Sequence, residues 1–220
     1  MNNIHLKNIY KSFDDGINST NVFENISLTI DTGKLTALIG KSGSGKSTFL
    51  HLIAGLLEPT KGSIFFNEKN INSMPSLERA RNLSFVYQFH ALLEDLNVME
   101  NICLPIQISK TTITDNDMKY IHNLMELIGI SDKQDSYPYQ LSGGEKQRVS
   151  ILRSLSLKPK FVLMDEPTGN LDEHNSEKIQ NLCLDINKNL DIGIIVATHD
   201  NTFANRMETV LSIVDNNVLA

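Results

Sequence analysis

Apolar positions along the chain predict two kinds of strand. Ile26, Leu28 and Ile30 alternate with polar residues, which is typical of a strand with one buried face. Short segments of strand length follow at 35–39, 63–66, 83–87, 161–164 and 194–197. Residues 210–214 and 218–219 flank Asp215-Asn216-Asn217, which predicts a terminal hairpin. The segment at 35–39 is nearly continuously apolar, as in a buried strand, and those at 161–164 and 194–197 are again apolar runs of strand length.

Helical periodicity occupies the rest of the chain. Residues 47–57 and 173–189 predict helices that each follow a strand. From about residue 88 to 157 the signals are mostly helical. Met118, Ile121, Met125 and Ile128 recur at helical spacing there, and Gly129 supplies a C-cap. These patterns predict an α/β core that is interrupted by a helical insertion.

Composition narrows the possible partners. The 220 residues are 40% apolar and 21% charged, with a net charge of −6 and a pI of about 5.5. This acidic balance argues against a nucleic-acid partner, which needs a basic face. Cys103 and Cys183 are too few and too far apart for a metal site or a disulfide framework, so we expect reduced core thiols. The polar start shows no signal peptide, and no apolar run reaches membrane-spanning length. We therefore expect a chain that is soluble or held at a membrane by something else.

A phosphate-binding loop is predicted between the strand at 35–39 and the helix that follows. The stretch "GKSGSGKST" contains G-x-x-x-x-G-K-S, and its strand and helix context separates it from an ordinary flexible loop. Glycines let backbone N–H groups point at the phosphates, a lysine adds positive charge, and a serine hydroxyl suits Mg²⁺. The predicted nucleotide-binding residues here are Gly40, Lys41, Ser42, Gly43, Ser44, Gly45, Lys46, Ser47 and Thr48, with Ser47 also a Mg²⁺ ligand.

Two acidic residues follow a second buried strand, in "FVLMDEPTGNLD". Ligands bind beyond the carboxyl ends of strands in such sheets, which is where Asp165 falls. We expect Asp165 to hold Mg²⁺, through water, and Glu166 to polarise an attacking water. For Glu166 the alternative is a plain acidic neighbour without a catalytic role.

A second anion site is predicted in "QLSGGEKQRVSILRSL". Ser142 has the character of an N-cap, and Glu145 completes a capping box. Free N–H groups and the positive end of a helix dipole would meet at Ser142, Gly143 and Gly144. The alternative is that Ser142 only caps a helix. The chain lacks a guanine-reading N-K-x-D motif, since "NKNL" has no aspartate, and we set a GTPase aside.

The order "LSGGE" before "DEPTGNLD" makes the chain resemble the ATP-binding cassette ATPases over essentially its whole length. The resemblance implies a P-loop NTPase with a RecA-like core, a small N-terminal antiparallel β-subdomain and an inserted helical subdomain. The core and β-subdomain would cover 1–87 and 160–220, and the helical subdomain about 88–159. It also implies an ATPase that uses ATP and Mg²⁺.

The same resemblance answers why there are two phosphate sites. In this family the P-loop of one subunit faces a segment of another subunit called the signature, which is "LSGGE" in this chain. Ser142, Gly143 and Gly144 would therefore bind ATP held by the partner's copy of Lys46. Two copies of the chain would sandwich two ATP molecules head to tail. The signature ends here in Glu145 rather than the commoner glutamine, and a capping box accepts either residue.

Further positions match the family one by one. Phe13 resembles the aromatic residue that stacks on adenine, with Tyr10 as an alternative and a core role possible for either. Gln88 matches the glutamine that touches Mg²⁺ and the attacking water. Asp172 matches an aspartate at the subunit interface, and His199 matches the histidine near the γ-phosphate.

Within the family the chain resembles transporter ATPases, since it has no coiled coil or zinc module. "YQFHALLEDLNVMENI" and "DEPTGNLD" are most similar to the lipoprotein-releasing subgroup, which acts at the inner membrane. Export ATPases and a cell-division ATPase that acts as a regulatory module share much of the pattern and remain alternatives. We expect integral-membrane subunits to dock near Phe89 and His90 on the cytoplasmic face, whereas Leu92 and Leu93 are as readily explained by core packing.

Overall fold

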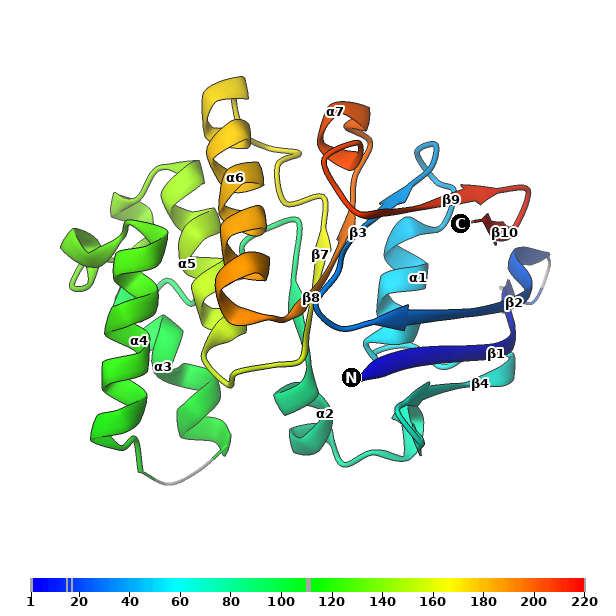
Figure 1. Cartoon of the computed structure of the whole chain (residues 1–220), viewed down its shortest axis with the longest axis horizontal. Coiled ribbons are helices and arrows are strands. Elements are labelled where there is room, and N and C mark those ends of the chain that lie inside the picture. Colours follow the sequence, from blue (N-terminus) through cyan, green and yellow to red (C-terminus); the bar gives the residue numbers. More distant parts are fainter. Residues whose placement is uncertain (1, 15, 17, 110–111, 220) are drawn as a thin grey trace.

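An antiparallel sheet lies at one end of the molecule (Figure 1). The computed structural model describes residues 2–14, 16, 18–109 and 112–219. In this sheet the strand order is β2-β1-β4-β5. Its strands are β1 (Asn3–Asp14), β2 (Ser19–Asp31), β4 (Lys61–Phe66) and β5 (Lys69–Asn70).

A second sheet of six strands forms the centre, in the order β10-β9-β3-β8-β7-β6. All neighbours run parallel except the terminal hairpin of β9 and β10. The strands are β3 (Leu35–Ile39), β6 (Leu83–Val86), β7 (Phe161–Asp165), β8 (Gly193–Ala197), β9 (Thr209–Val214) and β10 (Asn217–Leu219). Their carboxyl ends meet at one edge, where loops carry the predicted site.

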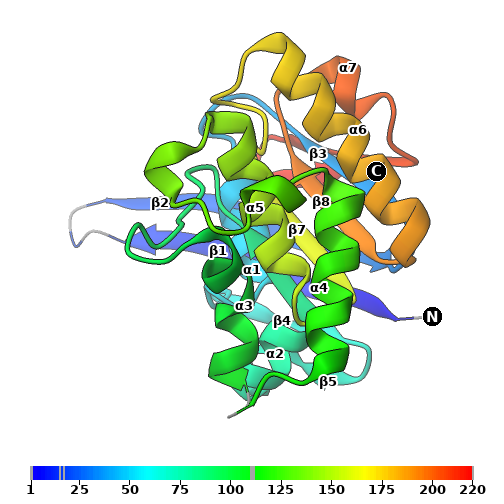
Figure 2. The ribbon, with the colours of Figure 1, turned by 90° about the vertical axis from the view of Figure 1, so that its left-hand side faces the viewer.

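Helices cover this sheet, and three of them gather at the end opposite the antiparallel sheet (Figures 1 and 2). Those three are α3 (Val98–Ser109), α4 (Asp115–Ile128) and α5 (Gly143–Leu155). The others are α1 (Lys46–Ile53), α2 (Ser76–Asn82), α6 (Glu173–Leu190) and α7 (Asn201–Ala204). Single 3₁₀ turns lie at Ile71–Ser73, Ser131–Lys133 and Pro138–Gln140.

The parallel sheet is buried on both faces, and β7 shows how. Val162 and Met164 belong to a hydrophobic cluster with α3, α4, α5 and α6. Phe161 and Leu163, which alternate with them, belong to another cluster with α1 and the antiparallel sheet. Because side chains alternate along a strand, one continuous apolar run fills both clusters.

The α/β fold class with a P-loop core, an antiparallel sheet and a helical insertion is confirmed. The C-cap at Gly129 is also confirmed: it is left-handed, and its N–H donates to the carbonyls of Glu126 and Met125. Both cysteines are free and buried, and burial raises the pKa of Cys183 to about 12. Among the described residues, no helix has the length and apolar character needed to cross a membrane. The subdomain boundaries at 87/88 and 159/160 remain predictions.

Two predicted elements need correction. The helix expected at 47–57 ends at Ile53, because Gly55 turns left-handed (φ 66°) and its N–H donates to the Leu52 carbonyl. Residues 88–97 are irregular rather than helical, and the first helix after them, α3, begins at Val98.

Candidate functional site

The P-loop runs from the end of β3 into the first turn of α1. Gly45 lies at the N-cap with φ 103°, a conformation that side chains disfavour. A Cβ atom at this position would come within 2.7 Å of Val22 Cγ1 and 3.0 Å of Phe23 Cζ. Glycine is therefore required here both by backbone conformation and by the close approach of β2.

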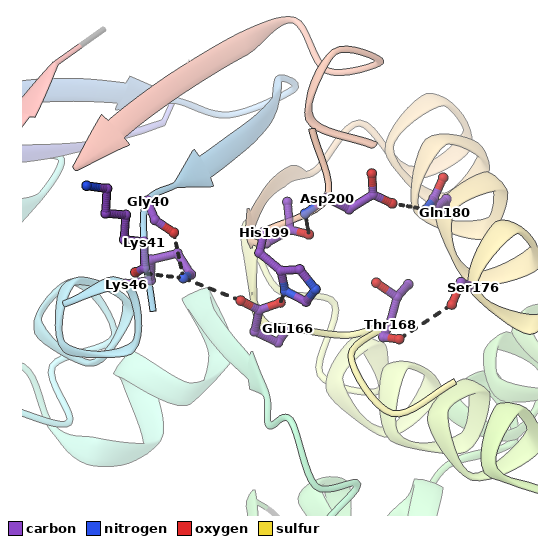
Figure 3. Close-up of polar contacts among 10 residues, drawn as sticks. Gly40, Lys41, Lys46, Glu166, Thr168, Ser176, Gln180, His199 and Asp200 are labelled. Carbon is purple, nitrogen blue, oxygen red and sulfur yellow. Dashed lines mark hydrogen bonds and ion pairs between the residues drawn. The ribbon is translucent and has the colours of Figure 1, made fainter. Parts of the chain in front are cut away.

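Lys46, Glu166 and His199 form a chain of polar contacts across the carboxyl ends of three neighbouring strands (Figure 3). Lys46 Nζ lies 3.5 Å from Glu166 Oε1 and donates to the Gly40 carbonyl at 3.0 Å. His199 Nδ1 lies 2.8 Å from Glu166 Oε2. The lysine and glutamate side chains are 9% and 14% exposed, whereas the histidine is 72% exposed and reaches toward solvent.

Asp165 is the last residue of β7 and is buried beside this chain. Its Oδ1 atom has no hydrogen-bond partner among the described residues. A buried carboxylate oxygen without a partner is costly unless a ligand satisfies it. Together with the Ser47 hydroxyl of the P-loop, its chemistry suits a hard cation such as Mg²⁺, which usually takes only one or two protein oxygens and completes its shell with phosphate and water.

A cavity of about 440 Å³ opens at this edge of the sheet. It brings together the P-loop, Gln88, Glu166 and His199. Its lining residues are Ser42, Gly43, Gly45, Lys46, Ser47, Thr48, Gln88, Glu166, Gly169 and His199. Backbone N–H groups, one buried lysine and several hydroxyls make the cavity suitable for a phosphate chain.

The signature residues lie at the start of α5, outside that cavity's described lining. Ser142 Oγ accepts a hydrogen bond from the Glu145 N–H at 3.4 Å and donates to Glu145 Oε2 at 2.7 Å, which completes the capping box. The Ser142 backbone N–H also donates to that carboxylate and is the main reason that the pKa of Glu145 is lowered. Lys133 Nζ lies 3.5 Å from Glu145 Oε1, so the charge at the end of the signature has a cationic neighbour.

Asn175, in the first turn of α6, lies close to the signature. A Cβ atom on Gly144 would come within 2.9 Å of Asn175 Oδ1, so glycine allows this close approach. Asn175 also donates to both carboxylate oxygens of Asp172, the N-cap of α6, at 2.9 Å from its backbone and 2.6 Å from its side chain. The backbone hydrogen bond is the main cause of the lowered pKa of Asp172.

The predicted aromatic residues and the docking residue Phe89 are exposed, whereas the docking residue His90 is half-buried. Phe13 and Tyr10, both on β1, are 46% and 37% exposed, so neither is a core residue, and neither is in the described lining of the cavity. Phe89 is 73% exposed. Leu92, in contrast, packs partly buried against the cluster around α3, which is the core alternative that the sequence left open for it.

Sequence reasoning missed several residues that shape the site. Gly169 lines the cavity, Asn175 binds Asp172 at the start of α6, and Lys133 pairs with the signature glutamate. None of these residues belongs to a sequence motif from whose spacing its contact could be predicted. Only the "GN" of "PTGNLD" could have drawn attention to Gly169, through the tight turn that it predicts.

Comparison with known proteins agrees with this geometry. A family described as "ABC transporter" matches residues 23–169. The lipoprotein-releasing system ATP-binding protein LolD of Buchnera aphidicola is 42% identical, covering 99% of this chain and 98% of the relative. The protein of the same name from Legionella pneumophila (strain Lens) is 40% identical, over 100% and 99%.

Solved structures give the same result. A dimeric ATP-binding cassette in a post-hydrolysis state, bound to ADP and Pi, superposes with a TM-score of 0.87 at 29% identity, covering 99% of this chain and 97% of that one. A dimeric bacterial ABC transporter cassette gives the same TM-score at 31% identity and the same coverage. Sequence and fold together define a P-loop ATPase.

The chain belongs to the ATP-binding cassette family and is an ATP-hydrolysing subunit of an ABC transporter. The predicted resemblance to the lipoprotein-releasing subgroup is confirmed, and the export and cell-division alternatives are not favoured.

Proposed function

We propose that this chain supplies the ATP-driven step of a system that releases lipoproteins from the inner membrane toward the outer membrane. The observation that carries this proposal is full-length similarity, at 40–42% identity, to two proteins named for lipoprotein release. The polar contacts of Glu166 with Lys46 and with His199 supply a site suited to ATP hydrolysis.

In this proposal Lys46 and the P-loop N–H groups bind the phosphates of ATP. Ser47, Gln88 and Asp165 hold Mg²⁺, with Asp165 acting through water. The ion, when bound, neutralises charge that develops on the phosphoryl oxygens. The partnerless Oδ1 of buried Asp165 and the position of Gln88 in the cavity lining support these assignments.

Glu166 is proposed to accept the proton of the attacking water. The carboxylate lies between two cationic or donor groups, which fix its orientation at the cavity wall. His199 is proposed to contact the γ-phosphate, because its exposed ring can reach a bound nucleotide while Nδ1 stays on Glu166. Gln88, which follows the neighbouring strand β6, is proposed to contact the attacking water.

The complete site is proposed to need a second copy of the chain. Ser142, Gly143 and Gly144 would bind the γ-phosphate of ATP in the partner, and Asp172 would lie at the interface. Ser142 and Asp172 are both exposed, and Asn175, which binds Asp172, lies close to Gly144, so both residues can meet a partner. Phe13 is proposed to stack on adenine, because it is the more exposed of the two candidate aromatics.

The membrane subunits are proposed to dock near Phe89 and His90. This would hold the chain at the cytoplasmic face of the inner membrane as a peripheral subunit. A large aromatic side chain that is 73% exposed, directly after Gln88, is a suitable anchor for such a partner.

Reconstitution tests the proposed cargo. The chain would be assembled with its membrane subunits in vesicles that hold an acylated model lipoprotein, and lipoprotein in the soluble fraction would be measured. We expect ATP-dependent release that is lost with Lys46→Ala. Full ATP turnover by the assembled complex without any release would contradict the proposed cargo and favour a regulatory module.

A further inference from the structure

The side chain of Arg153 holds the segment that carries Gln88 against the signature helix α5. Residues 87–97 connect β6 to α3 without regular structure. Arg153, near the end of α5, reaches this segment with both terminal nitrogens of its guanidinium. Nη2 donates to the His90 carbonyl at 3.1 Å, and Nη1 donates to the Ala91 carbonyl at 2.7 Å. The two contacts join positions 62 and 63 residues apart.

These contacts hold a conformation that the segment would not prefer alone. Ala91 has φ 49°, a left-handed value that non-glycine residues rarely adopt without support from their surroundings. The guanidinium presents its donors in a fixed fork, so two carbonyls on adjacent residues are held in one relative position. The guanidinium of Arg153 is partly buried, and this burial lowers its pKa. Hydrogen bonds made in such a partly desolvated position are stronger than in water.

A second contact between the same two elements involves His90. Its ring is half-buried, and its pKa is lowered by burial and by the charge of Lys146 on α5. A hydrogen bond with the backbone of Gly143 opposes this shift. The ring therefore lies against the first turn of α5, at the signature itself, while its carbonyl is held by Arg153.

We propose that Arg153 is a positioning residue that makes the segment after Gln88 and the signature helix move as one unit. The inference rests on the proposed function in one respect, namely that the signature serves the ATP of the partner. If so, each chain passes a change in the pocket that it holds, sensed at Gln88, to the pocket that it completes with Ser142–Gly144. Arg153 would thus connect the two ATP sites of the dimer through the interior of each subunit.

Arg148 provides a matched control on the same helix. Its Nη1 atom donates to the Gly129 carbonyl at 3.2 Å, at the end of α4. It makes an arginine–carbonyl contact like that of Arg153, but within the helical insertion and away from residues 88–91. Removing it alters charge and helix packing without releasing the Gln88 segment.

The first measurement uses the free chain and does not depend on dimerisation or cargo. The chain contains no tryptophan, so Phe89→Trp introduces a single reporter indole on the segment. We expect Arg153→Met to lower the steady-state fluorescence anisotropy of this reporter, and Arg148→Met to leave it unchanged. Unchanged anisotropy with Arg153→Met, or an equal fall with Arg148→Met, would overturn the proposal.

The second measurement separates positioning from simple destabilisation. In the chain assembled with its membrane subunits, Arg153→Met should lower kcat for ATP roughly 10-fold while KM changes less than about 2-fold, because small misplacements of catalytic groups reduce turnover more than binding. Arg153→Lys keeps the charge but loses the fork, and should give an intermediate kcat. If Arg153→Met does not fold, the lysine variant decides.

The outcomes distinguish this inference from the proposed function. A wild-type complex that hydrolyses ATP but releases no lipoprotein contradicts the proposed cargo and leaves the Arg153 comparison intact. A wild-type kcat in both Arg153 variants, with reporter anisotropy preserved, contradicts the coupling role of Arg153 even if lipoprotein release is confirmed.

Discussion

Glu166 has a backbone conformation that most residues other than glycine avoid. Its φ is 46°, its N–H donates to the Ala197 carbonyl, and its own carbonyl accepts from Gly169. Such strain is of order 1–3 kcal/mol and persists only where surrounding contacts hold it. Here the turn directs the side chain away from the strand axis and into the gap between Lys46 and His199.

We predict that Glu166→Gln binds ATP but hydrolyses it roughly 10²- to 10⁴-fold more slowly than the wild-type chain. The amide keeps the shape of the side chain and removes its charge and basicity. Loss of the negative charge should also favour a closed ATP-bound dimer. Steady-state hydrolysis and nucleotide affinity measure the two effects.

Glu173→Gln is the matched control for this variant. Glu173 is exposed in the first turn of α6, and its replacement by glutamine changes the net charge by the same amount as Glu166→Gln. It should leave turnover near wild type. A Glu166→Gln chain that also hydrolyses ATP at the wild-type rate would remove Glu166 from the role of base.

At the scale of elements, the segment 87–97 combines an exposed aromatic side chain with a backbone that hydrogen bonds hold in place. Asn101, fully buried on α3, donates to the carbonyls of Leu93, Leu96 and Asn97 and accepts from the Leu93 N–H. The backbone of the second half is thus held against the helical layer, while Phe89 remains exposed. A rigid frame with an exposed aromatic residue suits an interface anchor.

We predict that Phe89→Ala weakens assembly with the membrane subunits and leaves ATP binding by the free chain nearly unchanged. Co-purification of the two components reports assembly, and thermal unfolding of the free chain reports packing. Ile108→Ala is the control, because Ile108 on α3 is 74% exposed and its truncation removes exposed apolar surface comparable to that of Phe89. Undiminished assembly would exclude Phe89 as an anchor, whereas a destabilised free chain would indicate a packing role.

The elements that the sequence predicts best are those whose side chains repeat with one period. The five central parallel strands and α4 follow such patterns, and motifs placed the P-loop, Asp165, Glu166 and His199 at the right strand ends. Strand β1 was not apparent, because its apolar alternation breaks after Leu6, where Asn8 adopts φ 48° and the pairing with β2 shifts register. The contacts of Arg153 and Lys133 span many residues, and no local pattern encodes such pairs.

At the scale of the whole molecule, the described cavity holds only half of the proposed site. Its lining includes the P-loop and Glu166 but no residue of 142–144 among those described. A second copy placed head to tail would supply the missing donors. The two similar cassettes cited above were both solved as dimers.

We predict an ATP-dependent crosslink between chains that carry Lys41→Cys and chains that carry Tyr139→Cys, near Ser42 and Ser142 respectively. Both native cysteines are buried, and the introduced positions are exposed. The Glu166→Gln background should hold the closed state, and differently sized tags identify mixed products on a gel. A crosslink that forms equally without ATP, or mainly between identical chains, would exclude the head-to-tail arrangement.

The alternation of β7 between two hydrophobic clusters also limits how this protein can change during evolution. Deleting or inserting one residue within Phe161–Asp165 would reverse the alternation on one side of the change and turn those side chains toward the wrong cluster. The same slip would move Asp165 and Glu166 away from the P-loop. Selection should therefore remove length changes in this strand, because they impair both folding and ATP hydrolysis. Exposed loops can vary in length without either effect.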